Sequence, residues 1–276
     1  MMLAQTRAMA REARALSIPS AQSGVSPRAV LALGRIEARR ILLHPGFLGA
    51  AGLFMLFILV TVGGGGMFAS ADGSGRRIHF GFVAVGIAVG IAAGSLIASN
   101  LGAQRARRDR MLELYGSLPS PPEARTAAVM VGALLGPVLL ATLLTMLLAV
   151  LLRSDPEVGR YDHPSLVVQF PLMVVAFCAI GIGLARWVPG VFTAPVALIS
   201  QVMTPLLWAA PWIAPSESGM RVPWHLAYVV AVTVLWSALA FLRDRRTPIR
   251  ATLAIVALVV ASYAVFHQFP PSGSGL

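Results

Sequence analysis

The sequence predicts an all-α fold: a polytopic membrane helix bundle of six to seven transmembrane helices, preceded by an interfacial helix. Composition is the first observation, because 57% of the 276 residues are hydrophobic and only 12% are charged, against about 25% charged residues in soluble domains. The second is a regular series of long apolar segments. The third is an uneven distribution of arginine among the loops between them.

Seven apolar segments are separated by short loops, and each is near the ~20 residues that a helix needs to cross a bilayer. They cover residues 47–68, 80–100, 126–152, 164–185, 190–213, 223–242 and 251–269. The last segment is the least regular, because His267, Gln268 and Pro270 shorten its end. Whether it forms a seventh span is left open by the sequence.

All 22 basic residues are arginine, and their distribution among alternate loops predicts the orientation. One side of the membrane receives the arginines of residues 1–46, 101–125 and 243–250, together with Arg186. The other side has only Arg76, Arg77, Arg153, Arg160 and Arg221. The positive-inside rule then predicts a multi-pass protein of the cell membrane with a cytoplasmic N-terminus. The net charge of +11 therefore indicates topology and not nucleic-acid binding.

The beginning of the chain predicts two elements before the first apolar segment. Residues 1–25 lack the sustained apolar core of a signal peptide, so we expect a tail. Ser26-Pro27 has the form of an N-cap followed by proline at the first helical position, and His44-Pro45 interrupts the helix that it opens. The chain thus divides into a cytoplasmic N-terminal tail (1–25), an interfacial connecting helix (26–46), a transmembrane domain (47–269) with a cytoplasmic loop (101–125), and a C-terminal tail (270–276).

The ionisable residues limit the chemistry. All 11 Asp and Glu residues fall in predicted loops and tails, whereas carriers coupled to protons or sodium need an ionisable group inside the membrane. Without lysine the chain has no phosphate-binding G-x-x-x-x-G-K-[ST] loop, so we expect no ATP hydrolysis by the chain itself. His79, His163, His225 and His267 fall at span ends, where we expect interfacial anchors. No catalytic residue and no metal ligand is predicted.

Small residues recur in the second apolar segment. Gly86, Gly90 and Gly94 occupy every fourth position, a spacing that lets another helix approach closely. That helix can belong to the same chain or to another subunit.

A mildly polar stripe runs along the fifth apolar segment, where Thr193, Ser200, Gln201 and Thr204 share one helical face. These residues are candidates for lining a path for an amphipathic substrate. The alternative is hydrogen bonding between helices.

The most unusual stretch is a dense polar island at residues 104–126, between two uncharged apolar segments. Asp109 and Glu113 continue one face of a helix that prolongs the second segment, and a turn is expected at residues 116–119. Ser-Pro-Pro-Glu at residues 120–123 then has the form of a capping box that starts the next helix. The loop is either a solvated connector or a surface to which a soluble partner binds.

In three parts, taken in order, the sequence resembles the membrane subunit of type-2 ATP-binding-cassette (ABC) exporters, the drug and polysaccharide exporter permeases. Residues 28–49, RAVLALGRIEARRILLHPGFLG, look like the connecting helix of that family running into its first span. Residues 107–128, RRDRMLELYGSLPSPPEARTAA, are similar to its coupling region, with the turn at residues 116–119. The later spans, with a tight link at residues 186–189, resemble the remaining spans of that family's membrane subunit. The family usually has six spans.

The resemblance implies a transmembrane permease, an exporter of a hydrophobic or amphipathic substrate. It implies a second copy or homologue of the permease, surrounding membrane lipids, and a separate ATP-binding subunit that carries ATP and Mg²⁺. By position, the residues that couple to that subunit are Arg108, Asp109, Glu113, Leu114, Tyr115, Gly116, Ser117, Leu118 and Pro119. A non-transporting membrane scaffold or sensor subunit is the alternative, since the spans are only weakly polar.

Overall fold

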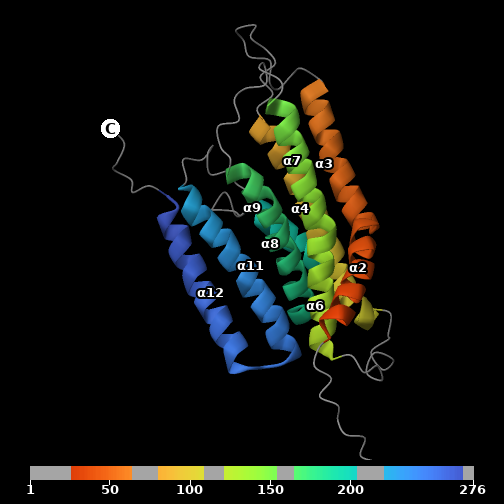
Figure 1. Ribbon diagram of the computed structural model, residues 1–276, viewed down its shortest axis with the longest axis vertical. Coiled ribbons are helices and arrows are strands. Elements are labelled where there is room, and N and C mark those ends of the chain that lie inside the picture. The colour runs from red at the N-terminus through yellow and green to blue at the C-terminus, as the bar shows by residue number, and fades with distance from the viewer. Residues whose placement is uncertain (1–25, 64–79, 109–120, 154–164, 204–220, 270–276) are drawn as a thin grey trace, which may run out of the picture.

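The computed structural model describes residues 26–63, 80–108, 121–153, 165–203 and 221–269, and every regular element among them is helical. In chain order the elements are α2 (Pro27–Leu42), α3 (Pro45–Gly63), α4 (Phe80–Arg108), α6 (Pro122–Ala133), the π-helical turn η1 (Leu134–Val138), α7 (Leu139–Arg153), α8 (Ser165–Trp187), α9 (Thr193–Met203), α11 (Val222–Asp244) and α12 (Pro248–His267). Most of the longer helices run along one axis, as Figure 1 shows. The all-α fold class is confirmed for these residues.

Five of the described helices are long and apolar enough to cross a membrane. They are Gly86–Arg105, Pro122–Leu147, Val167–Trp187, Val222–Asp244 and Pro248–His267. By length and composition, this agrees with a multi-pass membrane protein. The last of the five corresponds to the apolar segment that the sequence left open. The predicted segments 47–68 and 190–213 correspond to α3 and α9, which are not among the five, and part of each lies outside the described residues.

Prolines set the boundaries of the first helices. α2 begins at Pro27 with Ser26 at the N-cap position, as predicted, although the Ser26 side chain makes no capping hydrogen bond. α2 ends before His44 and α3 begins at Pro45, because the residue before a proline is disfavoured in a helix.

The predicted capping box was wrong. α6 begins at Pro122 with Pro121, not Ser120, at the N-cap position, and Pro121 makes no side-chain capping bond. Proline has no side-chain oxygen to accept a bond from the first turn. Glu123 still lies in that first turn, and Ser120 lies outside the described residues.

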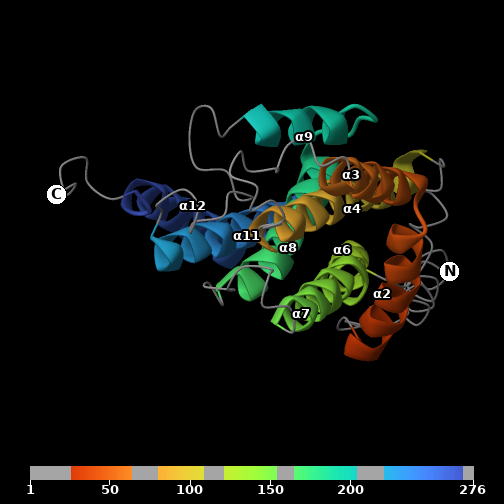
Figure 2. The ribbon, with the colours of Figure 1, turned by 90° about the horizontal axis from the view of Figure 1, so that it is seen from above.

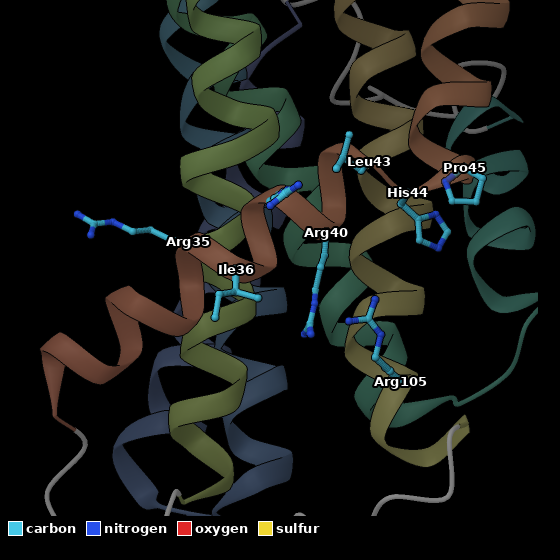
Figure 3. A pocket seen from close by; sticks show the side chains of 8 residues that line it. Arg35, Ile36, Arg40, Leu43, His44, Pro45 and Arg105 are labelled. Carbon is cyan, nitrogen blue, oxygen red and sulfur yellow. The ribbon is translucent and has the colours of Figure 1, made fainter.

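α6, η1 and α7 form one continuous helical rod with a local change of pitch. Pro137 lies inside η1, where proline cannot donate the usual backbone hydrogen bond and a π-type turn accommodates the break. Gly136, also in η1, lies against α2: a Cβ atom added to Gly136 would be 3.1 Å from the Ala38 carbonyl oxygen. Figure 3 shows α2 crossing α6 obliquely.

The centre of the bundle is formed by α4 and α8. Their candidate spans have 61% and 67% of their residues buried, against 22% for α12. Seen from above, the α11–α12 hairpin lies on one side of this central pair, and α2 with α6 lies on the other (Figure 2). Close approach of the central pair depends on Gly181, where an added Cβ atom would be 2.6 Å from the Leu96 carbonyl oxygen.

The glycine stripe of α4 faces α3. A Cβ atom added to Gly90 would be 2.6 Å from the Phe54 Cβ atom, and one added to Gly94 would be 2.8 Å from the Phe47 carbonyl oxygen. At these two positions the close neighbour is therefore a helix of the same chain. Gly86 lies one turn before Gly90 on the same helix.

Candidate functional site: the charged end of the bundle

Polar contacts concentrate where α4, α8 and α11 end and where α6 and α12 begin, at the lower end in Figure 1. We call this region the charged end. It is defined by Asn100, Gln104, Glu123, Thr126, Arg186, Asp244 and Arg250. The predicted coupling residues begin at Arg108, the last residue of α4, and otherwise fall between α4 and α6 in the chain. The charged end therefore includes both helices that flank the predicted coupling loop.

Asp244 is the most buried charged group of this region. Its side chain is only 5% exposed, and its Oδ1 atom lies 3.7 Å from Nη1 of Arg186, whose side chain is 22% exposed. The Thr126 hydroxyl donates a hydrogen bond to the other carboxylate oxygen. A buried carboxylate is tolerated only when it is paired and hydrogen-bonded. Asp244 therefore joins the ends of α11 and α8 to the first turns of α6.

Arg250 makes the second connection. Its Nη1 atom donates to the carbonyl oxygens of Phe241 at 2.8 Å and Arg245 at 3.0 Å, which stabilises the turn between α11 and α12. Its Nη2 atom lies 3.8 Å from Oε1 of Glu123 in α6. One guanidinium group thus contacts both the turn of the α11–α12 hairpin and the first turn of α6.

Two amide side chains fasten α4 to the rest of the charged end. Asn100 Nδ2 donates to the Gly181 carbonyl oxygen of α8 at 2.9 Å. Gln104 Nε2 donates to Asn100 Oδ1 at 2.7 Å and to the Gly190 carbonyl oxygen at 3.2 Å. Both side chains are buried, so the last described turns of α4 are bonded to α8 and to the link that follows it.

The predicted coupling residues fall mostly beyond the described ranges. Arg108 is the last residue of α4 and is exposed. The others, Asp109, Glu113, Leu114, Tyr115, Gly116, Ser117, Leu118 and Pro119, lie outside the described residues. The structure therefore describes the two helices that flank the predicted coupling loop and their contacts with later helices.

Three of the predicted substrate-path residues, Thr193, Ser200 and Gln201, belong to α9. Thr193 donates a hydrogen bond to the Val188 carbonyl oxygen at 2.9 Å, and Ser200 donates to the Ala197 carbonyl oxygen at 2.7 Å. Both hydroxyls therefore bond to nearby backbone. The Gln201 side chain and Thr204 lie outside the described residues, and the substrate path stays a prediction.

The opposite end of the same helices contains a buried polar group that the sequence did not indicate. We call it the amide end, defined by Gln169, His225 and Gln268. His225 Nδ1 lies 3.2 Å from Gln268 Oε1, and His225 Nε2 lies 3.4 Å from Gln169 Nε2. An amide oxygen only accepts, so the ring carries its proton on Nδ1 and accepts through Nε2. These bonds join α8, α11 and the end of α12.

His225 requires a correction to the sequence analysis. The sequence predicts an interfacial anchor, but His225 is completely buried, at 0% exposed. It lies near the start of α11, at a span end as expected, but it packs among buried polar side chains. The three residues of the amide end are far apart in sequence, so no local pattern could have revealed them.

The described residues contain no group of three or more His, Cys, Asp or Glu side chains arranged to hold a metal ion. Comparison of the chain with protein-family models, with curated proteins and with solved structures gives no match. The class that the fold defines is a multi-pass helical membrane protein with a charged end and an amide end.

Proposed function

We propose that this chain is the permease subunit of an ABC transporter that exports a hydrophobic or amphipathic substrate. In this proposal six to seven spans cross the cell membrane, α2 lies at the cytoplasmic surface, and a second permease completes the translocation path. A separate subunit binds and hydrolyses ATP. The observation that carries the proposal is that both flanks of the predicted coupling loop are bonded to later helices.

The flank formed by α4 reaches the later helices through two buried amide side chains. Asn100 and Gln104 bond to the backbone of Gly181 and Gly190. A force applied at the end of α4 would therefore act on α8 and on the link before α9. Networks of hydrogen bonds and packed helices of this kind can carry energetic coupling between distant sites.

The flank formed by α6 reaches the later helices through charge. Thr126 bonds to Asp244, and Glu123 pairs with Arg250. Separating a buried charge from its partner is costly, so α6, α11 and α12 are expected to move together at this end. A partner that closes on the loop would thus act on α8 through α4, and on α11 and α12 through α6.

Charge distribution supports the orientation. Arg105, Arg107 and Arg108 lie in the last turn of α4, at the end that the arginine bias assigns to the cytoplasm. A cytoplasmic ATPase would find its docking surface there. The absence of lysine from the sequence fits an arrangement in which ATP is hydrolysed on another chain.

The test is co-expression with a Walker-motif ATPase encoded in the neighbouring open reading frame. We expect a stable complex with ATPase activity and ATP-dependent movement of lipid or drug in proteoliposomes, and no ATPase activity from the purified chain alone. The variant D109R/E113R should uncouple ATP hydrolysis from transport. D155R/E157R makes the same change in charge in a loop predicted to be on the other side, and it should leave coupling intact.

Two results would change the assignment. If D109R/E113R keeps both the complex and the coupling, the predicted loop is not the coupling region. If a complex forms but nothing is moved in response to ATP, the chain is a membrane scaffold or sensor subunit.

A further inference from the structure

A groove rich in arginine lies beside the charged end, between α2 and the last turns of α4. We call it the arginine groove. Its volume is about 640 Å³, and it is lined by Arg35, Ile36, Arg39, Arg40, Leu43, His44, Pro45 and Arg105. Figure 3 shows Arg40 extending from α2, and Arg105 from α4, toward the space between the two helices. Four guanidinium groups and one imidazole thus line one groove, and none of the described residues that line it is acidic.

Most of this positive charge is not neutralised within the described part of the chain. Arg40 pairs with Glu37, with 2.8 Å between Nη1 and Oε1. Arg35, Arg39 and Arg105 have no acidic partner among the described residues. A guanidinium group presents five N–H donors in a fixed fork that matches the oxygens of a phosphate group. The groove therefore offers an excess of donors and of charge to an anion.

His44 adds a further donor. Its Nδ1 atom accepts a hydrogen bond from the Gly46 backbone N–H at 3.0 Å, so the neutral ring carries its proton on Nε2. Burial lowers the pKa of His44, and the positive charges of Arg105 and Arg108 lower it further. An anion bound in the groove would offset those charges and favour the protonated ring.

The apolar surroundings indicate what kind of anion fits. Ile36 is 49% exposed and Leu43 is 60% exposed, both within the groove lining. α3 begins at Pro45, itself in the lining, and it exposes Leu48, Leu53 and Leu56 along its length. Free phosphate needs no apolar surface, whereas the acyl chains of a phospholipid do. Exposed apolar residues beside arginine are typical of segments that bind anionic membrane surfaces.

We propose that the arginine groove binds the phosphate headgroup of an anionic phospholipid, whose acyl chains lie against the exposed face of α3. The inference needs a membrane around the helices but does not depend on the transporter assignment. Binding would hold the junction of α2 and α3 to the end of α4. It would thereby make the position of the predicted coupling flank sensitive to lipid composition.

The test is titration of the purified full-length chain, in a non-ionic detergent, with phosphatidylglycerol, and bound lipid is counted by native mass spectrometry. Phosphatidylcholine, which has no net charge, and inorganic phosphate, as a competitor, form the other arms. We expect R39Q/R105Q to weaken phosphatidylglycerol binding by about tenfold or more, since each bond to a charged group contributes about 1.5–3 kcal/mol and 1.4 kcal/mol is tenfold.

The matched control is R28Q/R246Q, which removes the same charge from two exposed arginines outside the groove lining. It should change the affinity by less than about twofold, because surface charge at a distance is screened. Equal weakening by the two double variants would overturn the proposal in favour of diffuse electrostatic attraction. So would displacement of the lipid by equimolar inorganic phosphate, or equal affinity for phosphatidylcholine. If R39Q/R105Q does not purify as a single species, R39Q alone, at an exposed position, carries the same test.

Discussion

The two ends of the bundle bury polar groups in different ways. At the charged end, a carboxylate that is 5% exposed depends on Arg186 and Thr126. At the amide end, His225 is 0% exposed and bonds to the neutral side chains of Gln169 and Gln268. Burying charge costs more than burying a neutral dipole, so the charged end depends on each partner being present. α8, α11 and α12 are thus joined at both ends, and the charged end is the one that a change in charge can open.

The largest effect should come from breaking the buried ion pair. D244A leaves the Arg186 guanidinium partly buried without its carboxylate, and it removes the acceptor of the Thr126 hydroxyl. We expect the free energy of unfolding to fall by about 3 kcal/mol, measured by denaturant titration in detergent.

The double variant R186M/D244L is the control for that prediction. Replacing both charges by apolar side chains leaves no unpaired charge, so most of the loss should be recovered. A double variant as unstable as D244A would show that packing around Asp244, and not its charge, holds the charged end together.

A smaller effect is expected at the amide end. H225L removes the partner of two buried amide groups, Gln169 Nε2 and Gln268 Oε1. An unsatisfied neutral group costs about 1–3 kcal/mol, and hydrogen bonds between membrane helices average below that. We expect a loss of about 1–2 kcal/mol by the same measurement.

T233V serves as the control, because the Thr233 hydroxyl donates its hydrogen bond to the Val229 carbonyl oxygen of its own helix, at 2.8 Å, and does not join two helices among the described residues. It should have little effect. If H225L costs as much as D244A, the contrast between a charged and a neutral end does not hold.

The sequence predicted the helices better than their contacts. Apolar length and proline positions are local signals, so the sequence predicts the break at His44-Pro45 and the long apolar helix over Val222–Asp244. Both signals can be found in a short stretch of sequence. The thickness of a bilayer sets the length of an apolar helix, and proline ends or begins a helix.

The contacts of the charged end could not be read in the same way. Thr126 and Asp244 are 118 residues apart, and pairing at that distance depends on how the helices pack. Asp244 lies in an arginine-rich stretch, so the sequence predicts a loop there, and composition does not reveal that its carboxylate is buried in the bundle. The arginine groove was missed because its charges come from α2 and α4 and meet only in the folded chain.

The smallest effect concerns pH and His44, beside the charged end. Arg39 and Arg40 of α2 line the same groove, and Arg105 and Arg108 of α4 act on the ring. Burial and the charges of these α4 arginines hold the pKa of folded His44 below its ordinary value of 6.5. The unfolded chain therefore binds the proton more readily, and stability is lost as the pH falls below about 6.5. The loss should be smaller than that caused by H225L, since the ring is partly exposed.

The measurement is the unfolding midpoint at pH 7.5 and pH 5.5 for the wild-type chain and for H44Q, which has no titratable group at position 44. H44Q should show a smaller fall in midpoint between the two pH values, and the difference belongs to His44 because all other residues are the same in both proteins. Saturating phosphatidylglycerol should reduce the wild-type fall, since a bound anion offsets the arginine charges that oppose protonation. If the unfolding midpoint falls equally in wild type and H44Q, the arginine groove does not lower the pKa of His44. Protonation of His44 would then not affect stability beside the charged end.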